Sequence, residues 1–134
     1  GRKAIILITD GIDNASRLSL FESMFAAGRV GVEIYTIGFA GSSESLRDKN
    51  EEGTNAEILK LVSKETGGTF FWIDDPDELK EALHSVEDDL RSQYVLGYTP
   101  PRTKCGGSFR RIELRVGKDR YNVRTRKGYV SGPC

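Results

Sequence analysis

Oxygen-bearing side chains follow the first apolar segment of the chain directly. Residues 5–8 are an unbroken apolar run, Thr9 and Asp10 come immediately after it, and Asp13 lies three residues further on. Hard cations such as Mg²⁺ take oxygen ligands and often use one or two carboxylates, with water filling the remaining positions. Asp10 is therefore a candidate metal ligand, and Asp13 and Thr9 are candidates to support it. Alternatively, the two carboxylates cap the next helix, and the spacing alone favours neither interpretation.

The apolar run predicts where these side chains lie in the fold. An apolar segment without alternation is typical of a strand buried on both faces, in a parallel sheet covered by helices. In such sheets ligands bind outside the carboxyl ends of the strands, which is where Asp10 is expected.

The sequence lacks the motifs of several catalytic classes. It contains no P-loop, no Gly-x-Gly-x-x-Gly after the first strand and no Gly-x-Ser-x-Gly elbow. The single histidine, His84, falls in the middle of a predicted helix, where a solvent-exposed position explains it. We therefore expect a protein that is not an enzyme. The alternative is a metal-assisted hydrolase or phosphoryl-transfer domain that uses Asp10 and Asp13.

The chain up to residue 92 alternates strands and helices, which predicts parallel strands with right-handed crossovers. The first helix is expected at residues 17–27, capped by Asp13, Asn14 or Ser16 and ended by Gly28 or Gly31. The further elements expected are a strand at 32–38, a loop at 39–53, a helix at 56–66 capped by Thr54 or Asn55, a strand at 69–73 and a helix that starts at Pro76. Inward-facing positions are expected at Leu18, Phe21, Phe25, Ile58, Leu61, Val62, Leu79, Leu83, Val86 and Leu90.

The last third of the chain has a different pattern and a different charge. A strand is expected at residues 93–98, followed by a hairpin with strands at 109–116 and 120–126. Residues 1–101 carry 10 Lys and Arg against 18 Asp and Glu, a net charge of −8, whereas residues 102–134 carry 10 against 2, a net charge of +8. Such a basic segment can bind nucleic acid. Because its arginines alternate with apolar residues, we favour the solvated face of a hairpin that docks on acidic helices.

The length and the cysteine content limit the number of domains and the possible disulfides. At 134 residues the chain has the length of one domain. It contains neither an apolar run of about 20 residues nor a signal peptide, although a leader could have been removed before Gly1. Cys105 and Cys134 could form a disulfide or remain free thiols.

Several segments, in this order and spacing, resemble a known family. Residues 5–14, 32–40 and 66–71 look like the second half of a von Willebrand factor type A (VWA) domain. A narrower resemblance, to bacterial VWA-related proteins of the acidobacterial type, is carried by residues 89–100, 108–114 and 124–129.

The resemblance implies a fold and a function. The fold is a partial, doubly wound, Rossmann-like parallel sheet over residues 1–92 that lacks its first strands, with a β-strand and antiparallel hairpin over residues 93–134. The function is non-catalytic protein binding or adhesion, and an exported, periplasmic or cell-surface location is favoured. The last β-strands would pair with a segment upstream of the VWA domain.

The resemblance also implies a metal-ion-dependent adhesion site, which this sequence completes only in part. In the complete domain a bound Mg²⁺, Mn²⁺ or Ca²⁺ would contact an acidic residue of a protein partner. The Asp of Thr-Asp-Gly is the one family ligand that carries over, onto Asp10, because no Asp-x-Ser-x-Ser occurs in the sequence. We therefore expect weak or absent metal binding by this chain. The missing strands would leave Ile5 and Leu7 on an open sheet edge, so we expect self-association.

Overall fold

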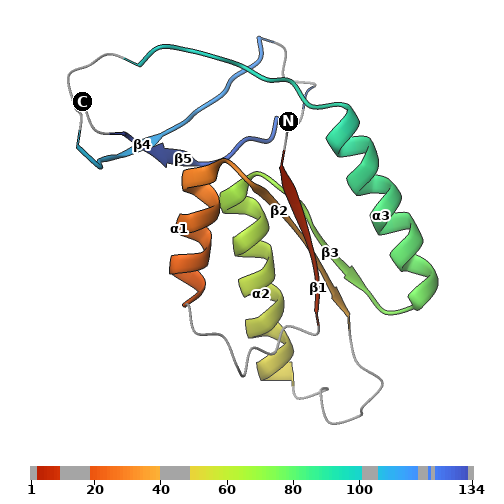
Figure 1. Ribbon diagram of the computed structural model, residues 1–134. Coiled ribbons are helices and arrows are strands. Elements are labelled where there is room, and N and C mark those ends of the chain that lie inside the picture. Colours follow the sequence, from red (N-terminus) through yellow and green to blue (C-terminus); the bar gives the residue numbers. More distant parts are fainter. Residues whose placement is uncertain are drawn as a thin grey trace.

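The computed structural model describes residues 3–9, 19–39, 49–100, 106–117, 121 and 123–132. Strands and helices alternate up to residue 91, and two short strands follow (Figure 1). In chain order the elements are β1 (Ala4–Thr9), α1 (Leu20–Val30), β2 (Glu33–Phe39), α2 (Lys49–Thr66), β3 (Phe70–Ile73), α3 (Pro76–Arg91), β4 (Phe109–Arg111) and β5 (Gly128–Val130).

The first three strands form a parallel sheet in the order β1-β2-β3. Ile5 lies opposite Ile34, Thr9 lies opposite Gly38, and Phe70 pairs with Thr36. β4 and β5 form a separate antiparallel pair. The predicted α/β class is confirmed at this level, as a mixed fold with a partial Rossmann-like sheet.

The central strand β2 is buried on both faces. Its residues alternate between two apolar clusters, as the pleat of a strand requires. Ile34 packs in a cluster with Ala27 of α1 and Val62 of α2. Ile37, on the other face, packs with Ile73 and with Ala82 of α3. Helices therefore cover both sides of the sheet at β2.

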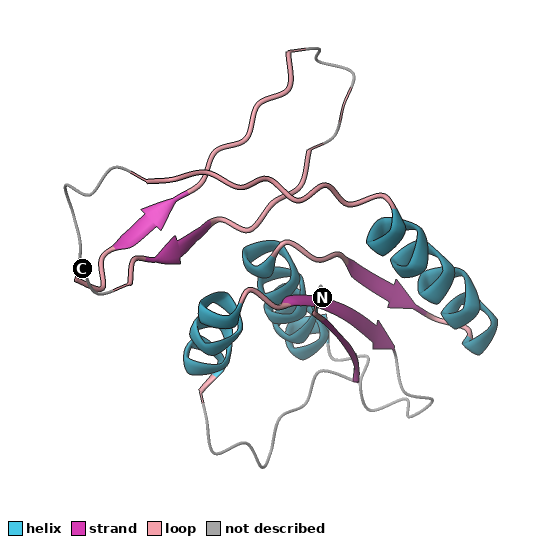
Figure 2. Ribbon diagram, turned by 45° about the horizontal axis from the view of Figure 1, so that its top comes forward, coloured by secondary structure: helices cyan, strands magenta, loops and turns pink. Residues whose placement is uncertain are grey.

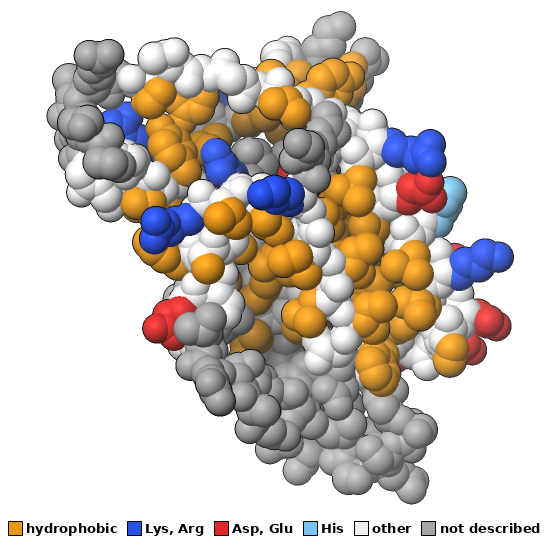
Figure 3. Space-filling view, viewed as in Figure 1, with side chains coloured by type: hydrophobic (Ala, Val, Ile, Leu, Met, Phe, Trp, Pro, Cys, Tyr) orange, Lys and Arg blue, Asp and Glu red, His pale blue; other side chains and the backbone are white. Residues whose placement is uncertain are grey.

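The first strand is not buried on both faces as its apolar sequence predicts. β1 is an edge strand of the described sheet, and no described helix contacts it. Ile5, Ile6, Leu7 and Ile8 are each between 40% and 50% exposed. The helices pack over β2 and β3 and do not reach β1, so its apolar side chains stay open on both faces. Figure 3 shows exposed hydrophobic side chains over the middle of the molecule, where Figure 1 places β1.

The predicted start of the first helix is wrong. α1 begins at Leu20 and is capped by Ser19, rather than by Asp13, Asn14 or Ser16. The Ser19 hydroxyl accepts from the Glu22 amide at 3.3 Å, and the Glu22 carboxylate accepts from the Ser19 amide at 2.8 Å, a reciprocal capping box. At the other end Gly31 adopts φ = 66°, which confirms it as one of the two predicted helix stops.

The predicted start is wrong for the second helix and confirmed for the third. α2 begins at Lys49, so Thr54 and Asn55 lie inside the helix and do not cap it. α3 begins at Pro76, as predicted, with Asp75 as its cap.

Several positions expected to face inward are exposed, because other residues of the same helices fill the core instead: Ala27 in α1, Leu59 in α2 and Ala82 in α3. Leu59 and Ala82 are 5% exposed, whereas Phe25, Ile58, Leu61 and Leu83 are 53%, 37%, 39% and 38% exposed.

The C-terminal segment contains less regular structure than its sequence predicts. Residues 93–98 form no strand, and Tyr94 and Val95 are 92% and 76% exposed. Of the predicted hairpin, only the start of the first strand is confirmed, as β4, because residues 112–116 are not a strand. The predicted second strand is wrong: residues 123–126 are not a strand, and β4 pairs instead with β5, which begins at Gly128. Figure 2 shows residues 92–100 as an extended loop that leads away from α3 toward the β4–β5 pair.

Candidate functional site

The predicted metal ligands Asp10 and Asp13 lie outside the described residues. Thr9 is the last residue of β1 and pairs with Gly38 near the end of β2. Since the strands are parallel, their carboxyl ends share one edge of the sheet, and Thr9 ends β1 at that edge. Among the described residues, no three His, Cys, Asp or Glu side chains gather in a group that could hold a metal. Metal binding at Asp10 therefore stays a prediction.

Cys105 and Cys134 also lie outside the described residues. His84 is on the exposed face of α3, with 72% of its side chain exposed. Its Nδ1 is 3.8 Å from Glu87 and its Nε2 is 3.7 Å from Asp88. The expected surface position of this histidine is confirmed.

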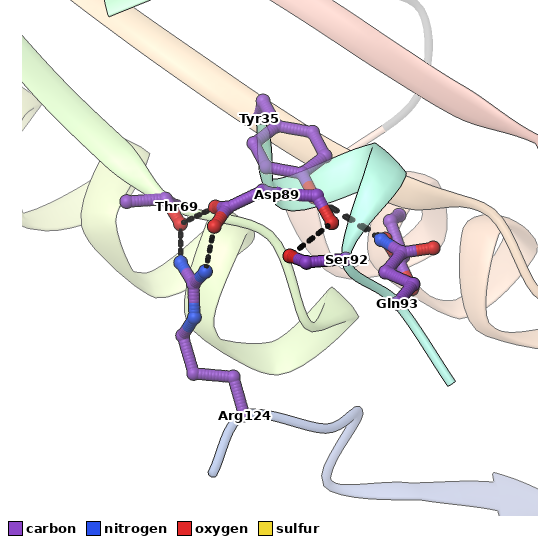
Figure 4. A network of polar contacts seen from close by, with 7 residues as sticks. Tyr35, Thr69, Asp89, Ser92, Gln93 and Arg124 are labelled. Atoms are coloured by element: carbon purple, nitrogen blue, oxygen red, sulfur yellow. Dashed lines mark hydrogen bonds and ion pairs between the residues drawn. The ribbon is translucent and has the colours of Figure 1, made fainter. Parts of the chain in front are cut away.

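A network of polar contacts among the described side chains lies at the opposite, amino-terminal edge of the sheet (Figure 4). Arg124, in the C-terminal segment, donates to the Asp89 carboxylate and to the Thr69 hydroxyl. The Thr69 hydroxyl also donates to Asp89 at 3.2 Å. Asp89 belongs to the last turn of α3 and Thr69 directly precedes β3, so one guanidinium joins three parts of the chain.

Partial burial strengthens this ion pair. The side chains of Arg124 and Asp89 are 43% and 24% exposed, which is less than the other described ion pairs. Hydrogen bonding to Asp89 raises the pKa of Arg124, although desolvation opposes this shift. The pair is consequently screened less by solvent than an ordinary surface pair.

A second part of the network surrounds the buried Tyr35. Its hydroxyl donates to the Glu33 carboxylate at 3.4 Å, and the Gln93 amide donates to the Tyr35 oxygen at 3.3 Å and to Glu33. Burial raises the pKa of Tyr35 to about 12, and the negative charges of Glu33 and Asp89 act in the same direction. Tyr35 is 1% exposed and therefore stays a neutral hydrogen-bonding group up to strongly alkaline pH.

The geometry of this network is suited to holding the C-terminal segment on the α/β core. The expectation that the basic segment docks on an acidic helix is confirmed for Arg124 and Asp89. The sequence indicated the charge complementarity but not the partners, which lie 35 residues apart.

Within the described residues, no helix combines the length and the apolar character needed to cross a bilayer.

No protein-family model matches the sequence, and no curated protein matches it. The structure is similar to the crystal structure of an uncharacterized membrane-spanning protein from Vibrio fischeri, with 25% sequence identity and a TM-score of 0.52. The similarity covers 67% of this chain and 47% of that one, so it spans less than half of the Vibrio protein chain. It supports the arrangement of the α/β core and indicates no activity.

Proposed function

We propose that the chain is a non-catalytic protein-binding module of the VWA type. In this function a divalent metal held through Asp10 offers an open coordination position to an acidic residue of a protein partner. The proposal is supported by the sequence resemblance, by the parallel order of β1, β2 and β3, and by the position of Thr9 at the carboxyl end of β1.

The observation that carries the proposal is the open edge of the sheet. β1 is an edge strand of the described sheet, with no described strand on its outer side, and no described helix covers its apolar side chains. An exposed, apolar edge strand is a template for pairing with another polypeptide. The binding surface then consists of β1 and the metal at the residue that follows it. Without a partner, the same edge promotes self-association.

The edge is tested by size-exclusion chromatography with light scattering over a range of protein concentrations. We expect the wild-type chain to form oligomers and the Ile6→Lys variant to shift toward monomer, because a charge on the edge strand opposes pairing. Val30→Lys is the matched control, because Val30 is 62% exposed on α1, away from β1. A wild-type chain that stays monomeric at every concentration would contradict self-association through this edge.

The metal site is tested separately, by titrating Mn²⁺ while recording nuclear magnetic resonance spectra. Paramagnetic broadening of the Thr9 and Gly38 amides is expected in the wild type and should disappear in Asp10→Ala. Binding should be weak, because one carboxylate replaces little of the hydration shell of the ion. Equal broadening in both proteins would show that Asp10 is not a ligand of the metal.

A further inference from the structure

A pocket of about 650 Å³ lies between the second half of α1 and the β4–β5 pair. α1 lines it with Gly28 and Arg29, and the C-terminal segment lines it with Gly106, Arg126 and Tyr129. This volume falls in the range of pockets that hold small organic molecules. The pocket is at the amino-terminal edge of the sheet, away from the edge at which Thr9 ends β1 (Figure 1).

The pocket is positively charged. Arg29 and Arg126 both line it, and no aspartate or glutamate does. Among the described residues neither arginine forms an ion pair, whereas Arg91, Arg115 and Arg124 each do. Two arginines therefore line one pocket without a described carboxylate to balance their charge.

The nearby helix end compensates only part of this charge. Arg126 lies close to the C-terminus of α1, with its Nη1 3.6 Å from the position of a Cβ added to Gly31. A helix C-terminus carries a partial charge of about −0.5. That is much smaller than the two positive charges, so the pocket remains attractive to an anion.

The walls leave room for a ring as well as for an anionic group. A Cβ added at Gly28, Gly106 or Gly132 would meet no atom within 4 Å. The Tyr129 ring forms one wall, and the Arg126 guanidinium lies 5.6 Å from the centre of that ring. Such cation–π contact holds the guanidinium in place while leaving its N–H groups able to donate.

The hydroxyl of Tyr129 adds a further polar atom near this wall. It is buried and makes no hydrogen bond of normal geometry with a described residue. It approaches Tyr98 closely enough to raise the pKa of that residue.

We propose that this pocket binds a small molecule with a phosphate monoester group, and that Arg29 and Arg126 contact the phosphate oxygens. Guanidinium groups match phosphate geometry through paired N–H donors. A phosphate monoester carries close to two negative charges at neutral pH, which matches two arginines that form no ion pair with a described residue. This binding site is separate from Asp10 and β1, so it goes beyond the proposed protein-binding function.

The test uses the full chain with phenyl phosphate as the probe. In two-dimensional amide spectra, we expect saturable shifts at Gly28, Gly106 and Gly132. Arg29→Gln and Arg126→Gln should each weaken binding about tenfold, which corresponds to about 1.4 kcal/mol. Arg91→Gln is the matched control and should leave binding unchanged, because this arginine lies on α3 and pairs with Glu87.

A second variant keeps the test valid if Arg126→Gln fails to fold. Gly28→Phe retains both arginines and fills the pocket, so it should abolish the shifts at Gly106 and Gly132. The proposal is overturned if sodium chloride at equal ionic strength produces the same shifts. It is also overturned if a folded Arg29→Gln/Arg126→Gln double variant binds as tightly as the wild type.

Discussion

The guanidinium of Arg124 pairs with the carboxylate of Asp89, which fastens the C-terminal segment to the last turn of α3. The same guanidinium donates to the Thr69 hydroxyl just before β3. A segment with little regular structure is thus held on the core by side-chain contacts and by a backbone hydrogen bond from the Lys127 amide to the Glu65 carbonyl of α2 at 3.4 Å. Its attachment should depend strongly on a few residues.

Replacing Arg124 should loosen this attachment. We expect Arg124→Gln to lower the free energy of unfolding by about 1–2 kcal/mol, because it removes charged hydrogen bonds from a partly buried site. The 43% exposure of the arginine side chain keeps the expected loss below that of a fully buried pair. Urea denaturation measures the effect, and a double-mutant cycle with Asp89→Asn isolates the coupling of the pair.

The pair Arg91 and Glu87 provides the control for this cycle. Their side chains are 75% and 51% exposed and lie one turn apart on α3. Exposed pairs of this spacing contribute about 0.2–0.5 kcal/mol. If the coupling of Arg124 to Asp89 is no larger than this value, the network does not hold the segment.

Tyr35 should make the stability of the protein depend on alkaline pH. Its pKa is raised to about 12 in the folded state, against 10.0 for an unperturbed tyrosine. The unfolded chain therefore loses this proton at a lower pH than the folded protein. The stabilisation is fully present below pH 10 and is lost as the pH rises through about 12.

The variant Tyr35→Phe isolates this contribution. Between pH 8 and pH 11.5, the wild type should lose more unfolding free energy than Tyr35→Phe does. The matched control is Tyr94→Phe, which removes the hydroxyl of a tyrosine that is 92% exposed. Parallel stability curves for wild type and Tyr35→Phe would contradict the raised pKa.

Local sequence signals were sufficient for some elements. Asp75, Pro76 and Glu78 form a helix start that depends only on neighbouring residues, so α3 could be placed from the sequence. β2 was also predicted correctly, because its apolar residues are flanked by glycines and are buried on both faces.

Other features depend on neighbours that the sequence does not specify. β1 has the apolar composition of a buried strand, but its burial depends on where the helices pack. Residues 93–98 favour a strand by composition, yet a strand requires a neighbouring strand, and neither described sheet includes this segment. Arg124 and Asp89 are 35 residues apart, which no local pattern reveals.

A buried pair of hydroxyls links β2 to α2. The Thr36 and Ser63 hydroxyl oxygens are 2.7 Å apart, and the Thr36 hydroxyl also donates to the Leu59 carbonyl at 3.0 Å. Thr36→Val should lower the free energy of unfolding by about 1–3 kcal/mol, because it removes both hydrogen bonds of the Thr36 hydroxyl and leaves the buried Ser63 hydroxyl without this partner. The double variant Thr36→Val/Ser63→Ala should lose less than the sum of the two single losses in urea denaturation. Additive losses would mean that the two hydroxyls act independently.

Two glycines should respond in opposite ways to alanine. A Cβ at Gly68 would lie 2.1 Å from the Ile34 carbonyl oxygen, so β2 would have to move. Because the obstacle is backbone in a packed core, Gly68→Ala should cost about 2 kcal/mol or more. A Cβ at Gly28 meets nothing within 4 Å, and this residue lies in α1, so Gly28→Ala should increase stability by about 0.5 kcal/mol. Thermal and urea denaturation of the two variants compare the effects directly, and equal stabilities would contradict the close contact between Gly68 and β2.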